Sequence, residues 1–149
     1  MITGERRVLL CKILLILNLS VIWGNSLLSG AESGQMSGGI VAFVMELLRI
    51  PVDYQDVLHL VIRKLAHVTE FACLSMLIGW YLAMGETKKC YRMLLPVLLA
   101  MAAALVDETI QLYTPDRGPS LTDVWIDTLG AAIGVMLLEL VYRVKRIRT

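Results

Sequence analysis

Five acidic side chains inside or beside long apolar runs are the clearest chemical signal in this sequence. One run holds Glu70, a second ends near Asp107 and Glu108, and a third opens with Asp123 and Asp127. Ionisable groups within membrane-length apolar segments are costly to bury and commonly mark a functional site. Carboxyl groups in such surroundings can act as general acids or bases, or can bind cations. We therefore expect these acids to belong to one site.

Basic side chains accompany the acids, but in smaller number. Arg63, Lys64 and His67 lie shortly before Glu70, and Arg117 lies in the Pro/Gly turn between the two acidic pairs. Three permanent cations, even with a protonated histidine, leave one of the five acids unmatched. An unpaired carboxylate in a low-dielectric environment takes up a proton or acquires a cation. The cluster is therefore expected to exchange protons or to meet a cationic ligand.

These residue types predict two kinds of role. The acid–base candidates are His67, Glu70, Asp107 and Glu108. The substrate-binding candidates are Arg63, Lys64, Gln111, Arg117, Asp123 and Asp127. The three cations among them suit phosphate or carboxylate groups. Histidine with carboxylates can also bind a divalent cation, but no H-x-x-x-H or H-E-x-x-H spacing is present. We therefore expect no metal and no other cofactor.

A structural explanation stays open beside the functional one. The same charges could form a salt-bridge network that pins the helices together. Polar contacts within membranes contribute only about 0.6 kcal/mol on average, and this cluster holds more polar groups than a few short helices need. Neutralising Glu108 or Asp127 separates the two explanations, because the structural network predicts a large loss of stability.

Long apolar helices are expected to position these side chains. Apolar residues make up 57% of the 149-residue chain, above the average of about 45–50% for soluble proteins. A single domain of this composition predicts an all-α, polytopic membrane protein. The transmembrane helices are expected at residues 6–27, 57–84, 93–113 and 121–142.

Two further segments lie between the first and second spans. Residues 26–39 are rich in serine and glycine and predict a loop. Residues 40–50 are too short to span a membrane, and their apolar residues recur at helical spacing. These residues are Ile40, Phe43, Val44, Leu47 and Leu48. A short helix with one apolar face is typical of the membrane interface.

The distribution of basic residues predicts the orientation in the membrane. Ten of the 14 lysines and arginines fall on one side, at the N-terminus, in the loop 85–92 and after residue 142. By the positive-inside rule this side is cytoplasmic, so both termini are expected inside. Arg6 and Arg7 precede the first run as in a signal peptide, but Lys12 interrupts it, and we expect the segment to stay as a helix. The candidate site residues then lie toward the outer leaflet.

Small residues share the faces that carry the polar side chains. Asp107 and Gln111 lie four residues apart, on a stripe continued by alanines. Asp127 shares its stripe with Gly130 and Gly134, a G-x-x-x-G pair that permits close helix packing. Both patterns turn the polar faces toward other helices rather than toward lipid. At the start of the same span, the Ser-Leu-Thr-Asp sequence at 120–123 matches a capping box.

These motifs resemble those of the VanZ-like membrane proteins. The matching segments are Lys64-Leu-Ala-His67-Val-Thr-Glu70-Phe, Asp107-Glu108-Thr-Ile-Gln111-Leu, Arg117, Ser-Leu-Thr-Asp123 and Asp127-Thr-Leu-Gly130. The resemblance covers nearly the whole chain, and these segments occur in the family's order. The family often has asparagine at the position of Asp127, so this chain adds a negative charge there. The resemblance implies a bacterial envelope protein that affects resistance to the glycopeptide antibiotic teicoplanin.

Two classes of function fit these features. One is a site in the outer leaflet of a bacterial plasma membrane that recognises or modifies an envelope lipid or glycan. The other is a non-enzymatic accessory protein that binds the antibiotic or a wall-synthesis protein through residues 40–50 and the preceding loop. A proton- or cation-coupled carrier is a third class, but four spans show no continuous polar pathway.

The sequence also indicates which partners to expect. Membrane lipid is the first partner of such a chain. Nucleic acid is not expected, because no basic patch with interleaved aromatic residues is present. The sequence leaves the oligomeric state open.

Overall fold

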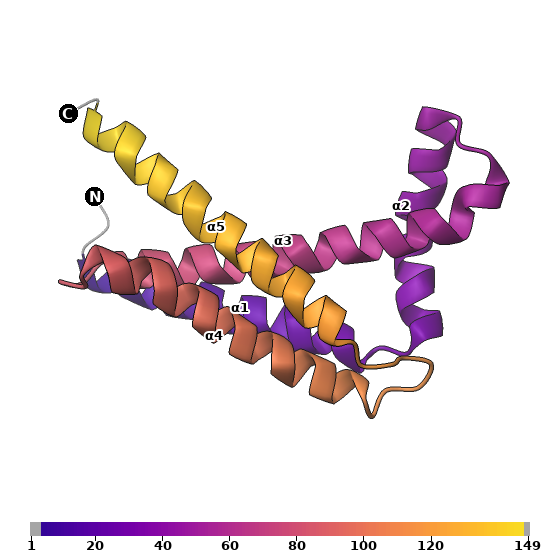
Figure 1. Cartoon of the computed structure of the whole chain (residues 1–149), viewed down its shortest axis with the longest axis horizontal. Coiled ribbons are helices and arrows are strands. Elements are labelled where there is room, and N and C mark those ends of the chain that lie inside the picture. The colour runs from indigo at the N-terminus through magenta and orange to yellow at the C-terminus, as the bar shows by residue number, and fades with distance from the viewer. Residues whose placement is uncertain (1–3, 148–149) are drawn as a thin grey trace.

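A computed structural model of the chain describes residues 4–147, and within that range every regular element is a helix (Figure 1). The elements are α1 (Gly4–Leu27), α2 (Gly30–Leu48), a single 3₁₀ turn η1 (Val52–Tyr54), α3 (Gln55–Ala83), α4 (Lys89–Gln111) and α5 (Leu121–Ile147). The predicted all-α class is confirmed.

Four helical segments are long and apolar enough to cross a membrane. They are Gly4–Leu27, Val52–Ala83, Lys89–Gln111 and Leu121–Arg146. The start of α1 and the end of α5 lie at one end of the molecule, whereas the α4–α5 turn and the start of α2 lie at the other end (Figure 1). The chain is a multi-pass membrane protein with the predicted number of spans among its described residues.

The helix ends differ from the predicted bounds at the basic end of the molecule. Lys89–Arg92 was predicted as part of a loop, and residues 143–147 as a tail, but both are helical. Lysine and arginine are good helix formers, and their long side chains can reach a polar surface from a helical backbone. Charge therefore marked the membrane boundary in the sequence but did not end the helices.

The prediction of a loop at 26–39 was wrong, and the short separate helix predicted at 40–50 is not confirmed. One 19-residue helix, α2, occupies most of this stretch. Ser29 caps it: the Ser29 hydroxyl accepts the backbone N–H of Glu32 at 3.2 Å, and the Glu32 carboxylate accepts the backbone N–H of Ser29 at 2.8 Å. The Ser29 hydroxyl also donates to the Glu32 carboxylate at 2.7 Å. This hydrogen bond, followed by the one from the Ser29 backbone, lowers the pKa of the Glu32 carboxyl. A capping box thus overrides the low helix propensity of the glycines that follow.

Tertiary contact fixes the start of α2 as well. The backbone N–H of Gly30 donates to the carbonyl oxygen of Pro115 at 3.1 Å. A Cβ atom at Gly30 would collide with the backbone of Asp116. The α4–α5 turn therefore packs directly on the first turn of α2, and only glycine permits this approach.

Helix α2 lies across the projecting N-terminal part of α3 rather than alongside the spanning helices (Figure 1). Four residues of its predicted apolar face, Ile40, Phe43, Leu47 and Leu48, are more than half exposed. At its C-terminal end Arg49 adopts a left-handed conformation with φ of 53°, and Pro51 follows. The part of the chain that the structure describes thus leaves this apolar face uncovered.

The α3–α5 contact is the most extensive in the molecule and aligns the site. A Cβ atom at Gly130 would lie 2.6 Å from the backbone oxygen of Val68, and one at Gly134 would collide with the backbone of Ala72. The predicted close packing at the G-x-x-x-G pair is confirmed. The hydroxyl of Ser75 adds a hydrogen bond to the carbonyl oxygen of Ala131 at 2.7 Å.

Candidate functional site

All ten predicted site residues lie on α3, α4, α5 or the α4–α5 turn. Asp107, Glu108, Gln111 and Asp127 are buried, and the others are half-buried. The backbone contact between Gly130 and Val68 brings the polar face of α5 directly against that of α3. Helix α4 closes the cluster from a third side.

His67, Asp107 and Asp127 meet at the centre of the cluster. One potential ligand atom of each lies within 4.8 Å of those of the other two. The Nδ1 atom of His67 is 3.6 Å from the Oδ2 atom of Asp127, which is longer than a hydrogen bond. Within the described chain, neither carboxylate oxygen of Asp127 has a hydrogen-bond partner, and its side chain is only 1% exposed.

Asp107 is held by two donors. The hydroxyl of Ser26 donates to one carboxylate oxygen, and the amide of Gln111 donates to the other at 2.9 Å. The predicted i, i+4 alignment of Asp107 with Gln111 is therefore a direct contact. Ser26 was not among the predicted site residues, because its segment was assigned to a loop. It lies in the last turn of α1, where a serine directly after an asparagine breaks the apolar run.

The end of α1 contributes a second unpredicted residue, Asn25. Its side-chain amide donates to one carboxylate oxygen of Glu70 at 2.8 Å, and the other oxygen of Glu70 is buried without a partner among residues 4–147. Arg117 donates to the backbone oxygen of Asn25 at 3.1 Å. Burial, followed by the nearby charge of Arg63, lowers the pKa of the Arg117 guanidinium.

Three predicted site residues, Lys64, Asp123 and Glu108, make contacts that hold the start of α5. Lys64 forms an ion pair with Asp123 across α3 and α5. Asp123 therefore does not complete a capping box with Ser120. The backbone N–H of Ser120 donates instead to a carboxylate oxygen of Glu108 at 2.6 Å. A glutamate of α4 thus caps the start of α5, because the tight turn places the two helix ends together.

Arg63 connects the cluster with a larger groove. A pocket of about 10 Å³ is bordered by Arg63, His67 and Asp127 among others, which is room for about one water molecule. A groove of about 550 Å³ between α2 and α3 is also bordered by Arg63. Over residues 4–147, Arg63 has no ion-pair partner within 4 Å. An unneutralised guanidinium thus stands between the groove and the buried acids.

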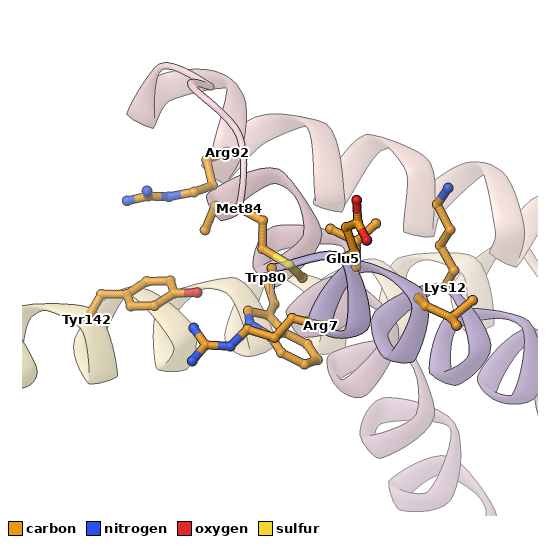
Figure 2. A pocket seen from close by; sticks show the side chains of 11 residues that line it. Glu5, Arg7, Lys12, Trp80, Met84, Arg92 and Tyr142 are labelled. Atoms are coloured by element: carbon orange, nitrogen blue, oxygen red, sulfur yellow. The ribbon is translucent and has the colours of Figure 1, made fainter. Parts of the chain in front are cut away.

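The opposite end of the molecule holds a cavity of about 1030 Å³ between α1, α3, α4 and α5 (Figure 2). Arg7, Lys12 and Arg92 border it together with Trp80 and Tyr142. In the sequence, the basic residues here indicated the orientation in the membrane but no cavity. Such a combination of cations and amphipathic aromatic rings is typical of a headgroup-level membrane boundary.

Searches of curated proteins and of solved structures returned no significant match. A comparison with family models returned a match. Residues 10–142 match the VanZ/LLP1 family, a range that includes all ten candidate site residues and most of every spanning helix. The match agrees with the resemblance carried by the motifs of α3, α4 and α5, and the chain belongs to the VanZ/LLP1 family.

Proposed function

We propose that this protein recognises the polar headgroup of a lipid or lipid-linked glycan in the outer leaflet of a bacterial plasma membrane. The observation that carries the proposal is the place of Arg63, which borders both the α2–α3 groove and the small pocket at His67 and Asp127. A headgroup in the groove would meet an unpaired cation next to a cluster of acid–base groups.

The orientation in this proposal follows from charge. Among the described residues, three segments rich in lysine and arginine lie at the end of the molecule opposite the α4–α5 turn (Figure 1). They are the start of α1, the α3–α4 connection and the end of α5. The positive-inside rule assigns that end to the cytoplasm. Both termini are then cytoplasmic, and the groove opens at the outer surface.

The groove suits a headgroup in size and in lining. Its volume falls within the range of about 300–1,000 Å³ found for small-ligand sites. Gly34 and Gly38 line it on α2, and a Cβ atom at either would meet no atom within 4 Å. The hydroxyl of Ser37 and Nδ1 of His59 lie 3.0 Å apart on its wall. Small residues keep the groove open, and polar groups line it.

The neighbouring cluster holds the groups that could act on a bound headgroup. A guanidinium binds phosphate or carboxylate oxygens through paired N–H donors. His67, Glu70, Asp107 and Glu108 are the groups that would move protons if the bound headgroup is modified. By the family's association with teicoplanin, we also propose that occupancy of this groove changes how cells respond to glycopeptide antibiotics.

The test compares two glycine substitutions on α2. Gly38→Leu fills the groove, whereas Gly39→Leu adds the same side chain at a residue that does not line it. In nanodiscs, native mass spectrometry would count short-chain phosphatidylglycerol and phosphatidylcholine bound to each protein. We expect the parent and Gly39→Leu to prefer the anionic lipid, and Gly38→Leu to lose that preference. Equal binding by the two variants would refute the groove site.

Arg63→Gln tests the charge directly. A hydrogen bond to a charged group contributes about 1.5–3 kcal/mol, so the substitution should weaken binding of the anionic lipid about tenfold or more. Arg49→Gln is the matched control, because Arg49 is exposed and does not border the groove. Teicoplanin susceptibility of cells expressing each variant should follow the same order.

A second function is favoured by the uncovered face of α2. Phe43 and Leu47 are each about two-thirds exposed. We propose as the alternative a non-enzymatic accessory role, in which this face binds a wall-synthesis protein or the antibiotic. Changes of Phe43 and Leu47 to serine would then abolish the cellular effect, while Gly38→Leu and Arg63→Gln would leave it unchanged.

A further inference from the structure

We propose that His67, Asp107 and Asp127 bind one divalent transition-metal ion, of the class of Zn²⁺ or Mn²⁺, between α3, α4 and α5. The residues come from three different helices, and their ligand atoms converge within 4.8 Å. This site goes beyond headgroup recognition and does not depend on it, because the three side chains form the site without any residue of the α2–α3 groove.

The spacing of the ligand atoms fits a shared ion better than a hydrogen bond. Ligands at about 2.1 Å from a tetrahedral ion lie about 3.4 Å from one another. The Nδ1 atom of His67 and the Oδ2 atom of Asp127 are 3.6 Å apart. Asp107 completes the group within 4.8 Å, so a shift of about 1 Å by its side chain would close the coordination.

The state of Asp127 is a second observation that points to a ligand. Its side chain is 1% exposed, and neither of its oxygens has a hydrogen-bond partner within the described chain. A buried carboxylate without a partner is strongly unfavourable. Its neighbour on the same face, Asp123, is neutralised by Lys64. A cation at the centre of the cluster supplies the partner that Asp127 lacks.

Hydrogen bonds behind Asp107 orient it toward the same point. Ser26 donates to one of its oxygens and Gln111 to the other. Each carboxylate oxygen offers two lone-pair directions, so both oxygens keep a free one for a metal. Metal-binding carboxylates and histidines are usually held by such outer hydrogen bonds.

The helix packing holds the remaining two ligands rigidly. Gly130 lies against the backbone of Val68, the residue after His67. Asp127 precedes Gly130 by nearly one turn on the same face. The distance between His67 and Asp127 is therefore set by backbone contact between α3 and α5 rather than by flexible side chains.

The ligand set selects the class of ion. Two carboxylates with a neutral histidine carry the two negative charges that a divalent ion neutralises. An imidazole ligand suits zinc and other transition metals, whereas Ca²⁺ and Mg²⁺ favour all-oxygen sites. Three protein ligands also leave a position open for a further ligand, as in catalytic zinc sites. The pocket of about 10 Å³ bordered by His67 and Asp127 is the natural place for that ligand.

The experiment uses the full chain in detergent, stripped with a chelator and then supplied with Zn²⁺, Mn²⁺ or Co²⁺ alone. Equilibrium dialysis with elemental analysis counts the bound ions, and visible absorption reports the ligands of Co²⁺. We expect saturable binding of one ion per chain. Ser26→Ala should weaken binding about 10- to 100-fold, as the loss of an outer hydrogen bond does in known metal sites. Asp127→Asn should weaken it at least as much.

Matched controls assign the ion to this site. Asp123→Asn makes the same chemical change one turn earlier on α5 and should bind like the parent. Asp127→Cys should retain Co²⁺ and add the charge-transfer absorption of a cobalt–thiolate bond. Absence of saturable binding by the parent would overturn the proposal, whatever the variants do. Equal binding by the parent and Asp127→Asn would overturn it as well, since the ion would then lie elsewhere, for example at the exposed Cys73 or Cys90.

Discussion

Helix α5 carries two buried acids that illustrate opposite uses of charge. Glu139, near the basic end, accepts a hydrogen bond from Arg92 at 2.8 Å, and the guanidinium of Arg92 lies over the ring of Tyr142 at 5.4 Å from its centroid. Asp127, in the cluster, faces His67 at 3.6 Å and has no hydrogen bond within residues 4–147. One acid is paired and the other is not, although both are buried.

This difference distinguishes a buried charge that the fold neutralises from one that it leaves unpaired. A buried acid with a close cation and further packing is neutralised by its own fold. A buried acid without a partner is maintained at a cost to stability, which is typical of binding and catalytic sites. The comparison therefore assigns Glu139 to helix packing and supports the proposed role of Asp127 in the site.

The largest expected effect comes from breaking the paired acid. Glu139→Ala leaves the charge of Arg92 partly buried, and removal of one partner of a buried pair costs about 3–5 kcal/mol. We expect a value near the lower limit, because the Arg92 side chain is 23% exposed. Chemical unfolding in detergent measures it. Arg143→Ala, an exposed position on the same helix, is the control, and an equal loss there would contradict the assignment.

A smaller loss of stability is expected from Gly130→Ala, which also changes the position of Asp127. The added Cβ would meet the backbone of Val68, and overpacking of this kind costs about 1–3 kcal/mol. It should separate Asp127 from His67 as well. Gly39→Ala, where the Cβ meets no atom within 4 Å, should instead stabilise its helix by about 0.5–1 kcal/mol. Thermal unfolding of the two proteins compares them.

Neutralising the unpaired acid, in contrast, should not lower the stability of the protein. In chelator, Asp127→Asn and Glu108→Gln are expected to melt at the parent temperature or slightly above it, because each removes a buried charge with an unsatisfied oxygen. A fall of many degrees in both would mean that the carboxylates hold the helices together. If a metal is bound, the parent and Glu108→Gln, which keep all three ligands, should gain about 2.7 kcal/mol at an ion concentration 100 times the Kd, whereas Asp127→Asn should not.

The smallest expected effect concerns Glu32, outside the spans. Its pKa is lowered in the folded protein by the hydrogen bonds from Ser29. The capping box therefore stabilises α2 fully above the unfolded pKa of about 4.3, and this contribution is lost as the pH falls through the lower folded pKa. Hydrogen exchange in the first turn of α2 should rise at low pH more in the parent than in Glu32→Gln, once both rates are corrected for intrinsic exchange.

The spans and the candidate residues were predictable from local pattern. Apolar runs of membrane length specify helices wherever they occur, because backbone groups in lipid must be satisfied internally. The placement of Asp107 with Gln111, and of Asp127 with Gly130, followed from helical periodicity alone. The extent of α2 could not be predicted in this way, because its glycines favour a loop. The Ser29 cap and the hydrogen bond between Gly30 and Pro115 make the segment helical instead.

The sequence by itself determined the number of spanning helices, the residue types of the cluster and its excess of acid, because composition and periodicity do not depend on which helices touch. Only the tertiary structure decided how that excess is distributed. Asp123 forms an ion pair with Lys64, Glu108 accepts the backbone N–H of Ser120, and Asp107 accepts the hydroxyl of Ser26. Asp127 has no hydrogen bond in the described chain. The physical reason is that pairing requires atoms of different helices within about 3 Å, and those distances arise only when backbones as close as those at Gly130 and Val68 have packed.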